Sequence, residues 1–210
     1  MPLPKILIDR YKDWKTNSFE TVKSNYEKIE INKQNPIAMV ISCCDSRIQE
    51  NVIFKTNPGD LFIHKNIANL IPPFNILDQN HNIGSSIEYA VKDLNVPHII
   101  ILGHSSCGGI KSAYDIMKNN YKSSDFNSLN NWLKIVKTPF ENLSLDFDVV
   151  ENLRLLEKEI IKNSIKNLLE YPFVNDLVTK NKIEIHGLWY EIKQGNLMYL
   201  NQSSGKFENL

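Results

Sequence analysis

Five residues in two short motifs have the types and the spacing of a metal-dependent active site. The first motif is Cys43-x-Asp45-x-Arg47, and the second, further along the chain, is His104-x-x-Cys107. Two thiolates and one imidazole suit zinc, and three protein ligands with one open position are typical of a catalytic zinc site. Zinc in such a site lowers the pKa of water to about 7, or somewhat higher beside two thiolates. We therefore expect Cys43, His104 and Cys107 to bind Zn2+.

Each motif follows an apolar run that ends abruptly. Residues 37–42 precede the first motif and residues 98–102 precede the second, and both runs are predicted to be buried strands. Because the carboxyl ends of parallel strands meet at one edge of a sheet, the two motifs are expected to share one pocket. Asp45 and Arg47 are close enough in the chain for a charge-assisted pair in which Arg47 fixes the carboxylate.

The rest of the chain alternates helices and strands. The patterns predict helices at about 9–31, 81–94 and 149–170, a further helix opened by Gly108-Gly109, a short amphipathic helix around Trp132, and strands at 61–63, 183–189 and 197–200. This order predicts an α/β fold: a mostly parallel central β-sheet with an antiparallel edge strand and helices on its faces.

Length and composition indicate a single domain over residues 1–210. The chain has 42% hydrophobic residues, and Lys+Arg and Asp+Glu both number 24, so the formal net charge is zero. No long basic block offers the footprint of a nucleic-acid binder, and no apolar stretch approaches the roughly 18 residues of a membrane helix. Three cysteines, two of them adjacent, form a poor disulfide framework and suit a reducing compartment. We expect a cytoplasmic protein with neither nucleic acid nor membrane as a partner.

The motifs and their surroundings resemble the β-class carbonic anhydrases, in particular the plant-like subtype. The segment Gly59-Asp60-Leu61-Phe62-Ile63-His64-Lys65-Asn66-Ile67-Ala68-Asn69 is similar to the family's segment between the motifs. Ile87-Glu88-Tyr89-Ala90-Val91 is similar to the helix before the second motif, and Gly187-Leu188-Trp189-Tyr190-Glu191-Ile192 to the closing strand pair.

This resemblance implies a zinc lyase, a carbonate dehydratase that reversibly hydrates carbon dioxide to bicarbonate and a proton via zinc-bound hydroxide. Asp45 would orient the hydroxide by accepting its proton, and Arg47 would hold Asp45 ready. In the family this aspartate can also swing onto zinc as a fourth ligand, which closes the site.

The resemblance also implies a substrate pocket and a partner subunit. Gln34, Phe62, Ile67 and Tyr89 match residues that line the pocket in the plant-like subtype, and Gly108 is assigned to the same pocket. The family's amino-terminal helices reach a second subunit, so residues 1–35 are expected to form a helical arm in a homodimer or a higher homo-oligomer. The apolar stripe on this arm suits a dimer surface or the chain's own core equally.

Three positions distinguish this chain within the family pattern. Val40 stands where another subtype has a tryptophan that belongs to an inhibitory bicarbonate site, so no such inhibition is expected. Cys44 stands where serine is common, and the register with Asp45 and Arg47 favours Cys43 over Cys44 as the ligand. Lys65 stands where arginine is common, which keeps the charge but loses the two-pronged geometry.

The motifs also allow other interpretations. The same zinc site could act on carbon disulfide or carbonyl sulfide, or the chain could be a non-catalytic, zinc-stabilised structural protein. A nucleophile elbow would need glycine where Cys107 stands, a phosphate loop lacks its Gly-Lys-Ser/Thr, and adjacent cysteines rarely form a good disulfide. The other histidines, His64, His81, His98 and His186, are interpreted as hydrogen-bonded core or surface residues.

Overall fold

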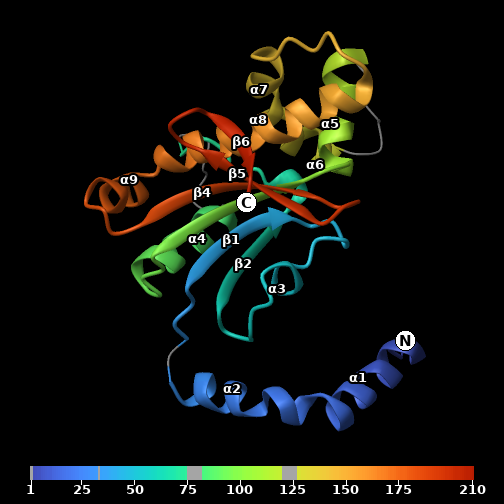
Figure 1. Ribbon diagram of the computed structural model, residues 1–210, viewed down its shortest axis with the longest axis vertical. Helices are drawn as coiled ribbons and strands as arrows, with labels where there is room; N and C mark the ends of the chain where they lie inside the picture. Colours follow the sequence, from blue (N-terminus) through green and yellow to red (C-terminus); the bar gives the residue numbers. More distant parts are fainter. Residues whose placement is uncertain (1, 33, 75–81, 120–126) are drawn as a thin grey trace.

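One mixed sheet runs through the computed structural model, which describes residues 2–32, 34–74, 82–119 and 127–210 (Figure 1). Its strand order is β2-β1-β3-β4-β5-β6. The strands are β1 (Ala38–Cys43), β2 (Leu61–Asn66), β3 (His98–His104), β4 (Glu184–Glu191), β5 (Asn196–Asn201) and β6 (Lys206–Asn209). The first four are parallel, and β5 and β6 are antiparallel to their neighbours. The predicted α/β fold is confirmed, with two antiparallel strands at the edge where one was expected.

Helices precede, link and cover these strands. They are α1 (Lys5–Asn17), α2 (Phe19–Ile31), α3 (Glu50–Ile53), α4 (Asn82–Lys92), α5 (Gly108–Asn119), α6 (Asn127–Trp132), α7 (Lys137–Glu141), α8 (Val149–Leu169) and α9 (Pro172–Thr179), with 3-10 turns η1 (Ile67–Asn69) and η3 (Leu133–Val136). The predicted helix at 9–31 is two helices that meet at Ser18. The predicted helix at 81–94 corresponds to α4, and residue 81 lies outside the described part of the chain. None of the described helices has the length and apolar character that a membrane span needs.

The main core lies on one face of the sheet. Alternate strand side chains, including Met39, Ile41, Ile99 and Ile101, pack there against α4, α8 and α9, and all four are fully buried. Burial of continuous apolar runs such as Ile99-Ile100-Ile101-Leu102 is what parallel strands covered by helices require. This core fixes the strands whose ends carry the two motifs.

Helix α8 comes very close to the sheet because two strand positions are glycine. A Cβ on Gly103 would lie 2.7 Å from Ile161 Cδ1, and one on Gly187 would lie 2.9 Å from Ile161 Cγ2. Asp148 caps the helix by accepting hydrogen bonds from the backbone N–H groups of Val150 and Glu151. The close approach brings the middle of α8 beneath the end of β3.

The opposite face of the sheet carries apolar side chains with much less covering from helices. Val40, Leu102 and Leu188 form a small cluster there with residues of the segment after β1. Helices α1 and α2 stand apart from the sheet as an arm (Figure 1), and neither contains a buried residue. The stripe on the arm is therefore not part of the chain's own core.

Candidate metal centre and active site

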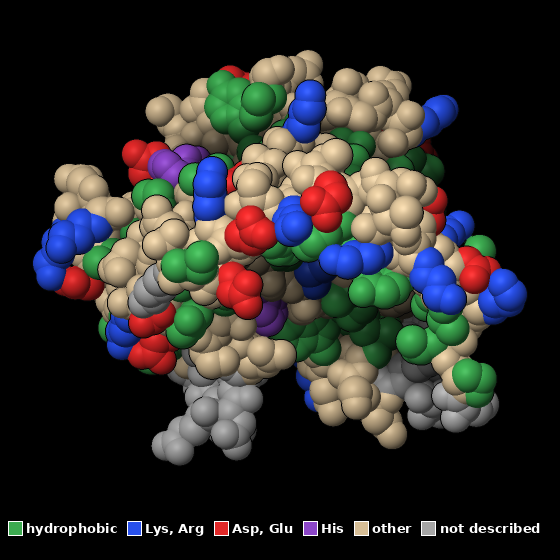
Figure 2. Space-filling model, turned by 90° about the horizontal axis from the view of Figure 1, so that it is seen from below, with side chains coloured by type: hydrophobic (Ala, Val, Ile, Leu, Met, Phe, Trp, Pro, Cys, Tyr) green, Lys and Arg blue, Asp and Glu red, His purple; other side chains and the backbone are tan. Residues whose placement is uncertain are grey.

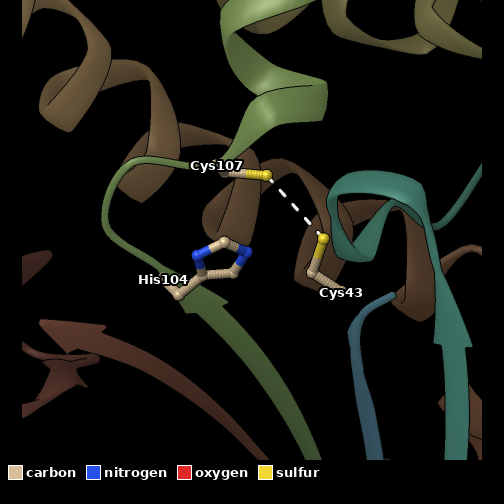
Figure 3. A group of neighbouring side chains, drawn as sticks. All are labelled: Cys43, His104 and Cys107. Atoms are coloured by element: carbon tan, nitrogen blue, oxygen red, sulfur yellow. Dashed lines mark hydrogen bonds between the residues drawn. The ribbon is translucent and has the colours of Figure 1, made fainter. Parts of the chain in front are cut away.

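Cys43, His104 and Cys107 meet at the carboxyl ends of β1 and β3. These strands are parallel neighbours, and Cys107 follows β3 in the turn before α5. Figure 3 shows the three side chains approaching one another from separate segments of the chain. Their ligand atoms all lie within 4.8 Å of one another, and the three residues are buried. The prediction that both motifs meet at one edge of the sheet is confirmed.

The imidazole of His104 is oriented for a metal ion. Its Nδ1 lies 2.9 Å from the carbonyl oxygen of Ser105, which can only accept, so Nδ1 carries the proton. Its Nε2 is buried and has no hydrogen-bond partner among the described residues. A buried ring nitrogen left with a free lone pair beside two thiols is a group that a zinc ion satisfies. The donor set of this pocket therefore fits zinc.

The thiols of Cys43 and Cys107 are hydrogen-bonded to each other. Their Sγ atoms are 3.8 Å apart, and this hydrogen bond lowers the pKa of Cys43 and raises the pKa of Cys107. Backbone N–H groups of Gly109 and Ile110, at the start of α5, act on Cys107 in the opposite direction because they stabilise its thiolate. Cys43 is therefore the thiol that ionises first, and a dication in place of the S–H···S hydrogen bond would remove the main cause that raises the pKa of Cys107.

Asp45 and Arg47 form the predicted ion pair at the rim of this pocket. The guanidinium hydrogen bonds hold the pKa of Asp45 well below its usual range, so the carboxylate is ionised at neutral pH. Oδ2 of Asp45 lies 3.9 Å from Nε2 of His104. A fixed negative oxygen thus lies beside the point at which the three ligand atoms converge.

Glu157 on α8 is a site residue that the sequence analysis missed. It is 1% exposed and accepts hydrogen bonds from the backbone N–H of Cys107 at 3.2 Å and from Nε1 of Trp189 at 3.1 Å. Burial raises its pKa. One signal for it was available: a carboxylate that lies among core positions of a helix, here between Leu156 and Ile160, is costly unless it is paired.

Lys65, the departure from the family pattern, supports the segment that carries Asp45. Its Nζ lies 2.9 Å from Oε1 of the buried Glu50 and donates to the carbonyl of Ile48 at 2.7 Å. The hydroxyl of Ser42, on β1, also donates to Glu50. A lysine at this position therefore still links β2 to the segment after β1.

The predicted pocket residues fall into two groups within one chain. Ile67 lines a cavity of about 460 Å³ together with Cys44, and the space around Gly108 is open, since a Cβ there would meet nothing within 4 Å. Gln34 and Tyr89 line a separate cavity of about 520 Å³ beside the arm, and none of the three clustered ligands lines either cavity. Ile67 nevertheless follows Asn66, which pairs with Cys43 of the cluster, and Gly108 follows Cys107.

Phe62 belongs with the second group. Its ring centroid lies 5.8 Å from that of Tyr89, and it pairs with Met39 near the start of β1, at the opposite end from Cys43. The structure thus places Ile67 and Gly108 near the metal cluster of their own chain and the other three residues away from it. Cys44 is exposed whereas Cys43 is buried in the cluster, as its register predicted.

Comparison with known proteins identifies the family. Residues 38–197 match the family described as carbonic anhydrase. The chain is 35% identical over 185 residues to beta carbonic anhydrase 3 of Arabidopsis thaliana, which covers 87% of this chain and 70% of that protein. The chain belongs to the β-class carbonic anhydrases. Its activity is that of a carbonate dehydratase acting on carbon dioxide and bicarbonate, and its Cys-His-Cys cluster implies zinc.

Further relatives agree with this assignment. A carbonic anhydrase of Synechococcus elongatus is 31% identical over 202 residues, covering 94% of this chain and 72% of that protein. The solved structure of the β-carbonic anhydrase CcaA superposes with a TM-score of 0.91 at 26% identity, covering 98% of this chain and 91% of that one. A tetrameric β-carbonic anhydrase of Sordaria macrospora gives 0.78 at 27% identity, with 94% and 96% covered. The resemblance inferred from the motifs is therefore confirmed.

Proposed function

We propose that this chain hydrates carbon dioxide reversibly to bicarbonate and a proton at a zinc ion held by Cys43, His104 and Cys107, with Asp45 and Arg47 as its catalytic residues. The observation that carries the proposal is the buried, unpartnered Nε2 of His104, which faces two thiols and lies 3.9 Å from the Asp45 carboxylate. Zinc in this position supplies a Lewis acid that lowers the pKa of water toward neutrality.

Asp45 orients the nucleophile in this proposal. Oδ2 of its carboxylate accepts a hydrogen bond from the O–H of the attacking oxygen. This hydrogen bond turns a lone pair of the attacking oxygen toward the carbon of carbon dioxide. Arg47 keeps the carboxylate ionised and turned toward the pocket, and the released proton passes to solvent. While Arg47 binds its carboxylate, Asp45 does not turn toward zinc to become a fourth ligand. In our proposal this conformation corresponds to the open site.

Gln34, Phe62 and Tyr89 complete the substrate pocket from a second subunit in our proposal, while Ile67 and Gly108 serve the pocket of their own chain. Two observations support this arrangement. The arm contains no buried residue although it presents a row of aromatic rings, Tyr11, Trp14, Phe19 and Tyr26, in contact with one another. On the opposite face of the sheet Val40 and Leu102 are buried, but apolar residues of the same cluster, such as Ile63, Ile100 and Tyr199, are only partly buried.

A homodimer or a higher homo-oligomer would bury these surfaces. Sedimentation measures the oligomeric state directly. The chain should sediment as a dimer or a larger oligomer, and replacement of Tyr11 and Trp14 by serine should shift the population toward monomer. A wild-type monomer at micromolar concentration would contradict the shared pocket.

The compartment is proposed from the thiols. All three cysteines are free, and Cys43 and Cys107 must remain reduced to bind a metal. This supports a reducing compartment such as the cytoplasm.

Figure 2 shows Lys and Arg interspersed with Asp and Glu on the face that it displays, rather than gathered into a basic field.

Stopped-flow hydration of carbon dioxide tests the function. Protein with quantified zinc should turn over carbon dioxide faster as the pH rises from about 6.5 to about 9, because a water molecule bound to zinc would ionise in this range. The Cys107→Ser variant should lose both zinc and turnover. No turnover at any pH, with one zinc per chain, would contradict the proposal and lead to tests with carbon disulfide and carbonyl sulfide.

A further inference from the structure

A second group of potential metal ligands lies at the opposite end of the sheet. Among the described residues, two groups of His, Cys, Asp or Glu bring their ligand atoms within 4.8 Å of one another: the zinc cluster, and His98, Glu184 and His186. His98 is the first residue of β3 and Glu184 the first of β4, whereas His104 is the last residue of β3. The second group thus lies at the amino ends of β3 and β4, and β3 is also the strand whose carboxyl end carries His104.

The register of two neighbouring strands brings the three side chains together. His98 pairs directly with Glu184, and His186 follows two positions later on β4, so all three point to the same face of the sheet. The backbone N–H of Glu184 also donates to the carbonyl of Pro97 at 3.0 Å, which holds the start of β4 against the start of β3. The side chains therefore project from rigid backbone.

The distances among the three ligand atoms leave room for a metal ion in place of the one hydrogen bond that joins the two rings. Nδ1 of His98 and Nε2 of His186 are 3.2 Å apart, and each lies 3.7 Å from Oε2 of Glu184. A separation of 3.7 Å is too long for a hydrogen bond, so the carboxylate is bonded to neither ring. The same separations leave a point about 2 Å from all three atoms, which is the usual bond length from zinc to imidazole nitrogen or carboxylate oxygen.

We propose that His98, Glu184 and His186 form a second metal site, distinct from the active site, that binds Zn2+ or another borderline divalent ion such as Ni2+ or Cu2+. Imidazole nitrogen is a donor that suits these ions, and zinc also binds carboxylate oxygen. The side chains are 43%, 71% and 39% exposed, in the order given, so an ion reaches them from solvent and water fills its remaining positions. This proposal does not depend on the proposed catalytic mechanism.

The neutral state of the His186 ring favours metal binding at neutral pH. Burial, together with the neighbouring imidazole of His98, lowers the pKa of His186, so its ring is neutral and able to coordinate. A bound ion would tie the first residues of β3 and β4 together and stabilise the fold by mass action. His98 and His186 are hydrogen-bonded to each other and partly exposed, as the sequence analysis expected, and the proposal adds metal binding to that role.

Metal counting on untagged, zinc-loaded enzyme tests the proposal. Equilibrium dialysis against micromolar Zn2+ should raise the content from one ion per chain to two. His98→Ala and His186→Ala should each remain at one ion, with affinity for the second ion lowered by more than about tenfold, and Glu184→Gln should weaken it less. The matched control is His64→Gln, which removes a histidine outside the group and should still take up the second ion.

Imidazole signals provide the second readout. In ¹⁵N-histidine spectra, added Zn2+ should shift the ring nitrogens of His98 and His186 and leave those of His104 unchanged, because the active site is already filled. The site is refuted if wild-type enzyme takes up no second ion. It is also refuted if the second ion persists in the variant that lacks both histidines.

Discussion

Arg47 binds both oxygens of the Asp45 carboxylate, with Nε 2.9 Å from Oδ1 and Nη2 2.7 Å from Oδ2. The same Nη2 donates to the carbonyl of Ser106 at 3.0 Å. The ion pair is thereby tied to the turn between His104 and Cys107, the two residues that we propose as zinc ligands on this side of the pocket. The planar fork of the guanidinium, and not its charge alone, sets the direction of the carboxylate.

Replacing Arg47 should lower turnover without removing zinc. We expect Arg47→Ala to reduce kcat/KM by about tenfold to a hundredfold, since Asp45 loses its orientation while the three ligands remain. Arg47→Lys should recover only part of the loss, because an ammonium cannot make two parallel bonds. Stopped-flow rates with parallel zinc analysis measure both effects, and full activity of the alanine variant would contradict this role.

Replacement of either adjacent cysteine should have a different effect on zinc content. Cys43→Ser should lose zinc, because a buried member of the cluster is removed, whereas Cys44→Ser should keep one zinc per chain because its thiol is exposed outside the cluster. Metal analysis after gel filtration decides between them. The reverse result would assign the ligand to Cys44 and shift the motif by one residue.

Glu157 should matter for stability as well as for zinc. Glu157→Ala leaves the backbone N–H of Cys107 and the indole N–H of Trp189 buried and unpaired, at a cost of about 1–3 kcal/mol each. Denaturant unfolding should show that loss, and zinc affinity should fall because the Cys107 turn is no longer held.

A control for this prediction lies on the same helix. Glu151 is 47% exposed, so Glu151→Ala should change the unfolding free energy by less than about 1 kcal/mol. Equal effects of the two replacements would show that the buried hydrogen bonds of Glu157 are not the cause.

The pH dependence of stability should include a contribution from His64. Burial lowers the pKa of this histidine, whose Nδ1 lies 3.1 Å from Oγ of Ser86. Below about pH 6.5 the unfolded chain binds a proton that the folded chain does not. The contribution is therefore fully present above that pH and is lost as the pH falls toward the folded pKa.

A comparison of two proteins measures this contribution. Between about pH 8 and about pH 5.5, wild type should lose more unfolding free energy than His64→Asn, because only the wild-type chain has this proton to bind on unfolding. Identical losses in the two proteins would exclude His64 as a source of acid sensitivity.

The sheet and the clustering of Cys43, His104 and Cys107 could be predicted from the sequence because both leave local signals. Runs such as Ile99-Ile100-Ile101-Leu102 are apolar at every position, which indicates parallel strands covered on their faces. The ligands follow the ends of such runs, so their meeting at one edge follows from the topology. Asp45 and Arg47 are separated by a single residue, so their ion pair is a local contact and could also be predicted.

Other features depend on contacts between distant segments. The arm reads as one helix because its apolar period continues across Ser18, where the backbone breaks. Strand β6 is short and mostly polar, and it is defined by its pairing with β5. His98 and His186 meet only through the register of β3 and β4, which no local pattern encodes. The placement of Gln34 away from the metal cluster likewise depends on where the arm lies, and that of Tyr89 on how α4 packs against the sheet.

The close contact between α8 and the sheet gives the last prediction. A Cβ on Gly103 would lie 2.7 Å from Cδ1 and 2.9 Å from Cγ1 of Ile161, so Gly103→Ala should destabilise the fold by about 1–3 kcal/mol. Ile161→Val removes Cδ1 at a cost of about 0.5–1.5 kcal/mol, and the double variant should be more stable than the sum of the two losses predicts.

The glycine should also act on the metal centre, because α8 carries Glu157. If alanine at position 103 pushes α8 away from β3, the carboxylate moves away from the Cys107 turn, and zinc affinity should fall in Gly103→Ala and recover in the double variant with Ile161→Val. Gly108→Ala is the matched control for stability, since a Cβ there meets nothing within 4 Å. Strictly additive losses, with zinc affinity unchanged throughout, would mean that the sheet accommodates the added methyl group without moving α8, and that Gly103 is not what sets the distance between Glu157 and the zinc ligands.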